Sequence, residues 1–188
     1  LPLYLQGPLG LSTTESGLVV LPGAVAMGLL GPLIGRIYDR WGTRVLLVPG
    51  TVIVVAILWS FTTLTESTPV WFILVTQTVL SIGLAMSFTP LFTASLGSLT
   101  PKYYSYGSAT VSTVQQVAGA AGVAVLISVM SSRSASALAE GAGAAAAGAA
   151  GARSAFLVAA IMAMPLLVSA FLIRKPADDP SAPAAHGH

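Results

Sequence analysis

This 188-residue sequence has few charged side chains and no cysteine. Only 7% of its residues are Asp, Glu, Lys or Arg, whereas 55% are hydrophobic. Soluble domains carry charge on about a quarter of their residues, so this composition does not suit a surface that faces water. Because cysteine is absent, disulfides, thiolate nucleophiles and cysteine-based metal sites are excluded. The composition therefore indicates an integral membrane protein.

Motifs for catalysis, cofactors and metals are also missing. The sequence holds no HExxH, no GxSxG, no phosphate-cradling glycine loop and no paired carboxylates, so we predict no catalytic, cofactor-binding or metal-binding residues and no enzyme. His186 and His188 lie in the terminal tail. We expect this tail to be solvated and its histidines not to bind a metal. The net charge of +2 comes without a cluster of Lys and Arg, which argues against nucleic-acid binding.

Long uncharged intervals are what the sequence has instead. A helix needs roughly 20 apolar residues to cross a bilayer, and five intervals reach that length. We predict an all-α membrane protein with transmembrane helices over about 17–37, 45–64, 70–96, 107–130 and 154–173. The helices at 45–64 and 154–173 have the least polar side chains, so we expect them to face lipid.

The remaining segments are predicted to be non-crossing. Residues 1–6, LPLYLQ, read as the end of a truncated transmembrane helix, and the chain as the C-terminal part of a longer protein. Residues 7–16 form a loop in which Ser12 or Thr13 caps the next helix. Residues 131–153, which contain the Gly/Ala tract, are predicted to be a flexible or loosely helical external loop that does not cross the membrane, and 174–188 a disordered tail.

The basic residues predict the orientation in the membrane, because short basic loops stay in the cytoplasm. One side of the predicted topology collects Arg36, Arg40, Arg44, Lys102, Arg174 and Lys175, and the other has Arg133 and Arg153. We therefore expect a multi-pass protein of the plasma membrane with the link at 35–44 and the C-terminus inside.

The most specific local feature is GRIYDRWGTR at residues 35–44. Asp39 falls near the negative C-terminal end of a predicted helix, so it needs compensation from Arg40, Arg44 or the N-terminus of another helix. Gly42 suits a turn that a residue with a Cβ would resist. A bland alternative is that the link is basic like any cytoplasmic loop.

The spacing G-x-x-x-D-R-x-G-x-R resembles the signature loop of the major facilitator superfamily. The stretches SGLVVLPGAVAMGLLGPLIGRIYDRWG, FTPL and GSATVSTVQQVAGAAGVAV are similar to its fourteen-helix drug:proton antiporter branch. The resemblance implies the C-terminal helical bundle of a transporter, comprising the end of helix 9 and helices 10 to 14, with the N-terminal half absent. It implies proton-coupled export of small lipophilic compounds by alternating access, and a conformational latch formed by Gly35, Asp39, Arg40, Gly42 and Arg44.

Polar and adaptable side chains inside the crossings are candidates for lining a substrate cavity. They are Gln77, Gln115, Gln116, Ser112, Met86 and Phe88, with Phe92 beside them. Alternatively, the glutamines tie helices together and the Met and Phe side chains fill the core. In the helix predicted over 107–130, a small, polar stripe runs along one face, and the valines of the helix lie only approximately opposite it. The stripe comprises Ser108, Ser112, Gln115, Gln116, Gly119 and Gly122, and the valines are Val111, Val114, Val117 and Val125. For helix packing we expect the small residues Gly28, Gly31, Gly119 and Gly122 to matter.

A proton-carrying group is not predicted in this chain, since all five crossings lack Asp, Glu and His. The alternative functions are an accessory or structural membrane protein and a transport-inactive truncated fragment.

Overall fold

The computed structural model describes residues 1–97 and 99–172, and all regular structure in these ranges is helical. The helices are α1 (Pro2–Gln6), α2 (Thr13–Trp41), α3 (Thr43–Phe61), α4 (Val70–Gly97), a 3-10 turn η1 (Pro101–Tyr103), α5 (Tyr104–Ala139) and α6 (Ala144–Leu172). Five of them, α2 to α6, are long and apolar enough to cross a membrane. This confirms the predicted all-α membrane class. The predicted tail at 174–188, with its two histidines, lies outside the described residues.

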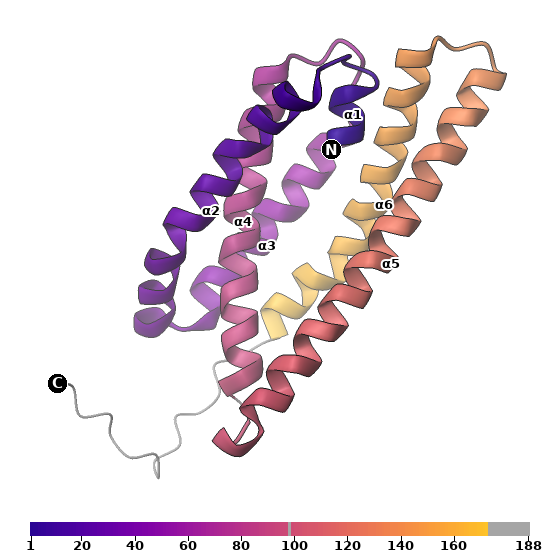
Figure 1. The fold of residues 1–188 in the computed structure, drawn as a ribbon. Coiled ribbons are helices and arrows are strands. Elements are labelled where there is room, and N and C mark those ends of the chain that lie inside the picture. The colour runs from indigo at the N-terminus through magenta and orange to yellow at the C-terminus, as the bar shows by residue number, and fades with distance from the viewer. Residues whose placement is uncertain (98, 173–188) are drawn as a thin grey trace.

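The long helices run up and down beside one another (Figure 1). Helix α4 packs against both α2 and α3, α3 also packs against α6, and α6 follows α5 along its length. Helices α4 and α5 touch at few positions although only η1 and short turns join them. Helix α3 is held between α4 and α6, whereas Val45, Val52 and Trp59 remain exposed, so the expectation that 45–64 faces lipid stays a prediction for this outer face.

Helix α2 begins at Thr13, inside the loop predicted over 7–16, so the last four residues of that segment belong to the helix. Ser12 is the N-cap, and the backbone N–H of Glu15 donates to Ser12 Oγ at 3.3 Å. In return the backbone N–H of Ser12 donates to Glu15 Oε2 at 2.8 Å. This reciprocal pair is a capping box, which satisfies donors that the first turn of a helix leaves unpaired. Of the two caps considered from the sequence, the structure uses Ser12.

The Gly/Ala tract is not the loop predicted over 131–153. Helix α5 continues to Ala139 and α6 starts at Ala144, so the turn spans only residues 140–143 and includes Gly141 at a φ of +89°. Alanine is the strongest helix former, and its small side chain lets helices approach closely. Ala149 and Ala152 are buried in the protein core. The tract is therefore a packing segment of α6.

Two apolar clusters hold the bundle together. The larger contains Tyr4, Leu5, Val19, Phe61, Leu64, Ile73, Ala149 and Ala152, and lies where α1, α2, α3, α4 and α6 meet. The ring centroids of Phe61 and Phe156 are 4.9 Å apart, and the hydroxyl of Tyr4 donates to the carbonyl of Thr65. The smaller cluster, Ile34, Leu46 and Ala85, lies near the other end of the bundle, close to the turn between α2 and α3.

The close helix contacts involve other glycines than those expected. A Cβ built on Gly28, Gly31, Gly119 or Gly122 meets nothing within 4 Å in the described part of the chain. At Gly23, in contrast, a Cβ would lie 2.5 Å from Ser81 Oγ, and at Gly50 it would lie 3.0 Å from the carbonyl oxygen of Gly83. Helices α2 and α3 approach α4 at these glycines, whereas none of the described residues packs against the Cβ positions of the four expected glycines, whose packing role stays a prediction.

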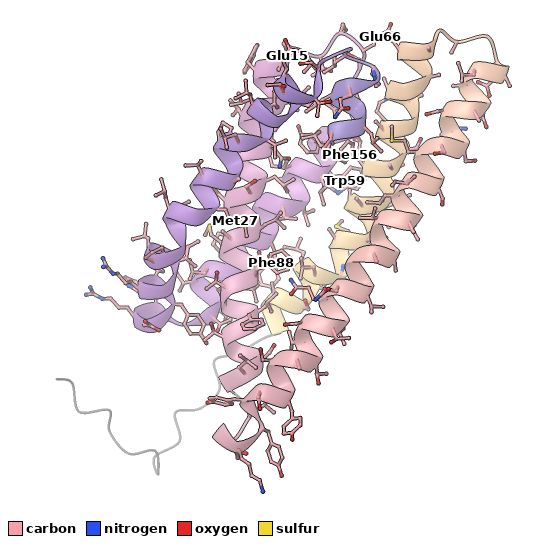
Figure 2. The ribbon with its side chains drawn as sticks, viewed as in Figure 1. Glu15, Met27, Trp59, Glu66, Phe88 and Phe156 are labelled. Atoms are coloured by element: carbon pink, nitrogen blue, oxygen red, sulfur yellow. The ribbon has the colours of Figure 1, made fainter. Side chains whose placement is uncertain are left out.

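The up-and-down topology separates charges by end. Arg36, Arg40, Arg44 and Lys102 lie at the end that holds the α2–α3 turn, whereas Glu15, Glu66 and Glu140 lie at the opposite end. Figure 2 shows Glu15 and Glu66 together there. Arg133 and Arg153 are the basic residues that share this acidic end in the described part of the chain.

Candidate functional site

A groove of about 350 Å³ separates α4 from α5. Its lining comprises Phe88, Leu91, Phe92 and Ser95 from α4, and Thr110, Val111, Val114 and Gln115 from α5. An overlapping hollow adds Thr89 and Thr93. The groove exists because α4 and α5 diverge beyond η1 and make few direct contacts (Figure 1).

Helical spacing explains which side chains reach the groove. On α4 the lining residues stand three and four positions apart, which places them on one face of the helix. Phe88, labelled in Figure 2, and Phe92 are both exposed aromatic rings on this face. Aromatic side chains supply large, adaptable apolar area without a charge. The α4 wall is therefore suited to the apolar body of a small molecule.

The hydroxyl protons in the groove are mostly used within the chain. Thr93 Oγ1 donates to the Thr89 carbonyl at 3.0 Å, and Thr110 Oγ1 donates to the Tyr106 carbonyl at 2.9 Å. Ser95 Oγ donates to the Leu91 carbonyl at 2.7 Å. The exposed amide of Gln115 is the strongest remaining hydrogen-bonding group on the wall.

The described residues that line the groove carry no ionisable side chain. Its volume falls within the range of about 300–1,000 Å³ that is usual for small-molecule pockets. The described wall of the groove is thus apolar and uncharged, with a single side-chain amide.

The structure brings together only some of the candidate cavity residues. Gln115 and Phe88 line the groove together, and Phe92 joins them. Gln116 is exposed about 100° further round α5, and neither it nor Ser112 lines the groove.

The other two candidates, Gln77 and Met86, lie on α4 away from the groove. The carbonyl of Gln77 accepts a hydrogen bond from Ser81 Oγ, where α4 approaches Gly23 of α2. Met86 packs against the smaller apolar cluster with Ile34 and Leu46. The position of Met86 therefore agrees with the alternative prediction, that this side chain fills the core.

Sequence reasoning missed the contribution of α5 valines to the groove. Val111 and Val114 were expected opposite the polar stripe, but they line the groove with Gln115. Val111 lies four positions and Val114 one position before Gln115, a spacing that is compatible with one face of a helix and could have indicated that all three line the same groove. It was not decisive, because the direction of α4 relative to α5 is not encoded in the pattern of α5 alone.

The second candidate site is the turn between α2 and α3. A single residue, Gly42, separates the two helices, and its φ of +80° is a conformation that side chains with a Cβ resist. Asp39, Arg40 and Arg44 line one hollow of about 270 Å³ with the first residues of α3. Asp39 is exposed. It shares this hollow with Arg40 and Arg44 and with the positive N-terminal end of α3.

Arg44 also reaches across the bundle. Its Nη2 donates to the carbonyl of Phe171, near the C-terminal end of α6, at 2.6 Å. Thr43 beside it is 1% exposed, and its hydroxyl has no partner among the described residues. The loop is thus anchored to the last helix by Arg44, while Asp39 and Arg40 face outward.

Five helices that are long and apolar enough to cross a membrane, with a groove between two of them, define an α-helical, multi-pass membrane protein. The family model of the Major Facilitator Superfamily matches residues 1–188. The chain belongs to this superfamily of membrane transporters.

Similar proteins include drug-resistance proteins. The chain is 41% identical over 112 residues to the lincomycin resistance protein LmrB of Listeria monocytogenes, a match that covers 60% of this chain and 24% of that protein. It is 38% identical over 112 residues to LmrB of Bacillus subtilis, covering 60% and 23%. It is 39% identical over 109 residues to the uncharacterized MFS-type transporter YcnB of Bacillus subtilis, covering 58% and 23%. The chain thus spans about a quarter of the length of the curated relatives it matches.

Proposed function

We propose that this chain is the C-terminal part of a secondary active transporter of the plasma membrane, in the fourteen-helix drug:proton antiporter branch. The complete transporter exports small lipophilic molecules, with lincomycin as the first compound to test because three relatives are named for resistance to it. It works by alternating access, in which two helical bundles rock around a central site. The C-terminus and the α2–α3 turn face the cytoplasm.

The observation that supports this proposal best is the groove between α4 and α5. It is large enough for a small molecule, it carries two exposed aromatic rings, and it offers the amide of Gln115 for a hydrogen bond. In a two-bundle transporter such a groove forms one wall of the cavity, and the N-terminal half supplies the other. The proton-carrying residue belongs to that other half, since the apolar cores of the five crossings hold no Asp, Glu or His.

The α2–α3 turn acts as the conformational latch of the transporter. Asp39 faces outward at the basic end of the bundle, where a helix end or an arginine of the N-terminal half can pair with it. In the complete transporter, Asp39→Asn is expected to reduce efflux at least several-fold without reducing the amount of protein in the membrane. Unchanged efflux would remove the latch from the proposal.

A chimera tests the transport function directly. This chain replaces the matching segment of Listeria monocytogenes LmrB, and the chimera is expressed in lincomycin-sensitive bacteria. We expect the chimera to lower cellular lincomycin and raise the inhibitory concentration, and to lose both effects when a protonophore removes the proton gradient. The 188-residue chain expressed alone is the matched control and is not expected to export.

Three results of this experiment would count against the proposal or against part of it. A chimera that inserts in full amount but exports none of a panel of neutral and cationic drugs would favour an accessory or structural role. Export by the chain alone would show that the groove needs no second half. Export that persists without the proton gradient would overturn the coupling but not the transporter.

A further inference from the structure

We propose that Arg133 and Arg153 form a binding site for the phosphate of a phospholipid at the acidic end of the bundle. Both arginines line one hollow of about 280 Å³, together with Thr62, Ala150, Ser154 and Leu157. The hollow lies where α5 and α6 pass the end of α3. It is separate from the groove between α4 and α5, with which it shares no residue.

The backbones of α5 and α6 hold the two arginines in place. At Gly151 a Cβ would lie 2.5 Å from the carbonyl oxygen of Met130 and would also clash with the Ser134 side chain. The helices therefore cross in near-contact between these positions, and Arg133 and Arg153 flank the crossing. The close helix pair thus brings two exposed arginines, one from each helix, to the lining of one hollow.

The hydrogen-bond donors available in the hollow are those of the two arginines. Thr62 Oγ1 donates to the Trp59 carbonyl at 2.7 Å, and Ser154 Oγ donates to the Ala150 carbonyl at 3.0 Å. No carboxylate stands among the described residues that line the hollow. Two like charges that share a space repel each other, so an anion that accepts from both is stabilised. A guanidinium group can donate two parallel hydrogen bonds to two oxygens of one phosphate, so phosphate is the anion that matches this pair of arginines best.

The position of the hollow along the helices selects a lipid as the source of the phosphate. Arg133 follows the apolar stretch 107–130 and Arg153 precedes the apolar stretch 154–173, so both lie at the depth where headgroups begin. Below them, Leu157 is 40% exposed and Trp59 is 43% exposed. These side chains offer an apolar track for an acyl chain that hangs from the bound phosphate.

The hollow at the α2–α3 turn makes a useful contrast. It also contains two arginines, but Asp39 lines it with them and Arg44 already donates to the Phe171 carbonyl. Its cations therefore have a carboxylate beside them. The pair Arg133 and Arg153 has none among the described lining residues, and it is the stronger anion site.

Trp59 reports on this site, because it lies one helical turn before Thr62 on the same face of α3. The chain carrying Trp41→Phe and Trp71→Phe is reconstituted in phosphatidylcholine vesicles, which leaves Trp59 as the single tryptophan. Brominated phosphatidylglycerol or brominated phosphatidylcholine is then titrated in as a quencher. We expect half-maximal quenching at a mole fraction of phosphatidylglycerol roughly fivefold lower than for phosphatidylcholine, whose choline offsets the phosphate charge.

Matched variants separate the site from net charge and from misfolding. Arg133→Gln with Arg153→Gln is expected to abolish the fivefold preference, whereas Arg36→Gln with Arg40→Gln removes the same charge from the other end and is expected to retain it. Arg133→Lys with Arg153→Lys keeps the charge and is expected to retain part of the preference. Circular dichroism verifies that each variant has the helix content of the parent.

Four results would overturn the proposal. The preference for phosphatidylglycerol could be absent in the parent chain, or it could persist in the variant without Arg133 and Arg153. It could also disappear equally in the variant without Arg36 and Arg40, which would show that net charge alone attracts the lipid. Inorganic phosphate in excess is expected to leave the quenching unchanged; if it displaces the brominated lipid, the hollow binds a free anion and not a lipid.

Discussion

Arg44 Nη2 donates a hydrogen bond of 2.6 Å to the carbonyl oxygen of Phe171, although 127 positions separate the two residues in the sequence. The last carbonyls of an α-helix have no partner within the helix, and a cation is favoured at this negative end. Arg44 therefore satisfies a backbone acceptor of α6 from the first turn of α3. It links the α2–α3 turn to α6, so a movement of the turn would displace or break this contact with α6.

Replacing Arg44 with glutamine is expected to lower the free energy of unfolding by about 1 kcal/mol, because the charged donor at the end of α6 is removed. Unfolding of the chain in detergent micelles, followed by circular dichroism, measures the effect. Arg36→Gln on the exposed surface of α2 is the control and is expected to change stability by less than about 0.5 kcal/mol. Equal effects of the two substitutions would show that the contact to Phe171 contributes nothing.

The number and class of the helices could be predicted from the sequence, but the ends of α5 and α6 could not. Charge-free length alone fixes the crossings, since a bilayer sets the number of apolar residues that a helix needs. The Gly/Ala tract looked like a loop because its small side chains have little surface to bury. In the bundle the same smallness is what allows Ala149 and Ala152 to enter the core, and that contact depends on the other helices.

Gly151→Ala is expected to destabilise the chain by about 1–3 kcal/mol, because the new methyl group would overlap Ser134 and the Met130 carbonyl. Gly122→Ala on α5 is the matched control, since nothing lies within 4 Å of its Cβ position in the described chain. There the substitution is expected to stabilise by about 0.5–1 kcal/mol through helix propensity. The two variants should therefore shift the unfolding midpoint in opposite directions, and a shift of the same sign would contradict the close crossing of α5 and α6.

Gly42→Ala tests the left-handed turn between α2 and α3. A Cβ at a φ of +80° is expected to reduce stability by roughly 1–2 kcal/mol. Gly35→Ala, in the helical part of α2 with open space around its Cβ position, is expected to be neutral or stabilising. Denaturant titration of both variants measures the difference. If Gly42→Ala is as stable as Gly35→Ala, the turn does not require glycine.

The groove was only partly predictable from the sequence, for a reason that its residues illustrate. Gln115 and Gln116 are adjacent amides in an apolar helix, and the sequence treats them alike. Which of them meets Phe88 depends on the rotation of α5 about its axis, and that is set by contacts with α6. Likewise Met86 and Phe88 differ by two positions on α4, yet the first packs toward α2 and α3 and the second toward α5.

The different positions of Gln115 and Gln116 relative to the groove predict different effects on function. In the exporting chimera, Gln115→Ala is expected to raise the lincomycin concentration in cells and to change the relative resistance to different drugs by roughly 5–10-fold, because it removes the amide hydrogen bond of the groove. Gln116→Ala removes the same chemical group one residue further along α5, outside the groove, and is expected to change drug preference less than about twofold. Amounts of both variants in the membrane, measured by immunoblotting, should match the parent. If both glutamines affect protein amount and transport equally, they tie helices together and the groove between α4 and α5 is not the drug-binding wall.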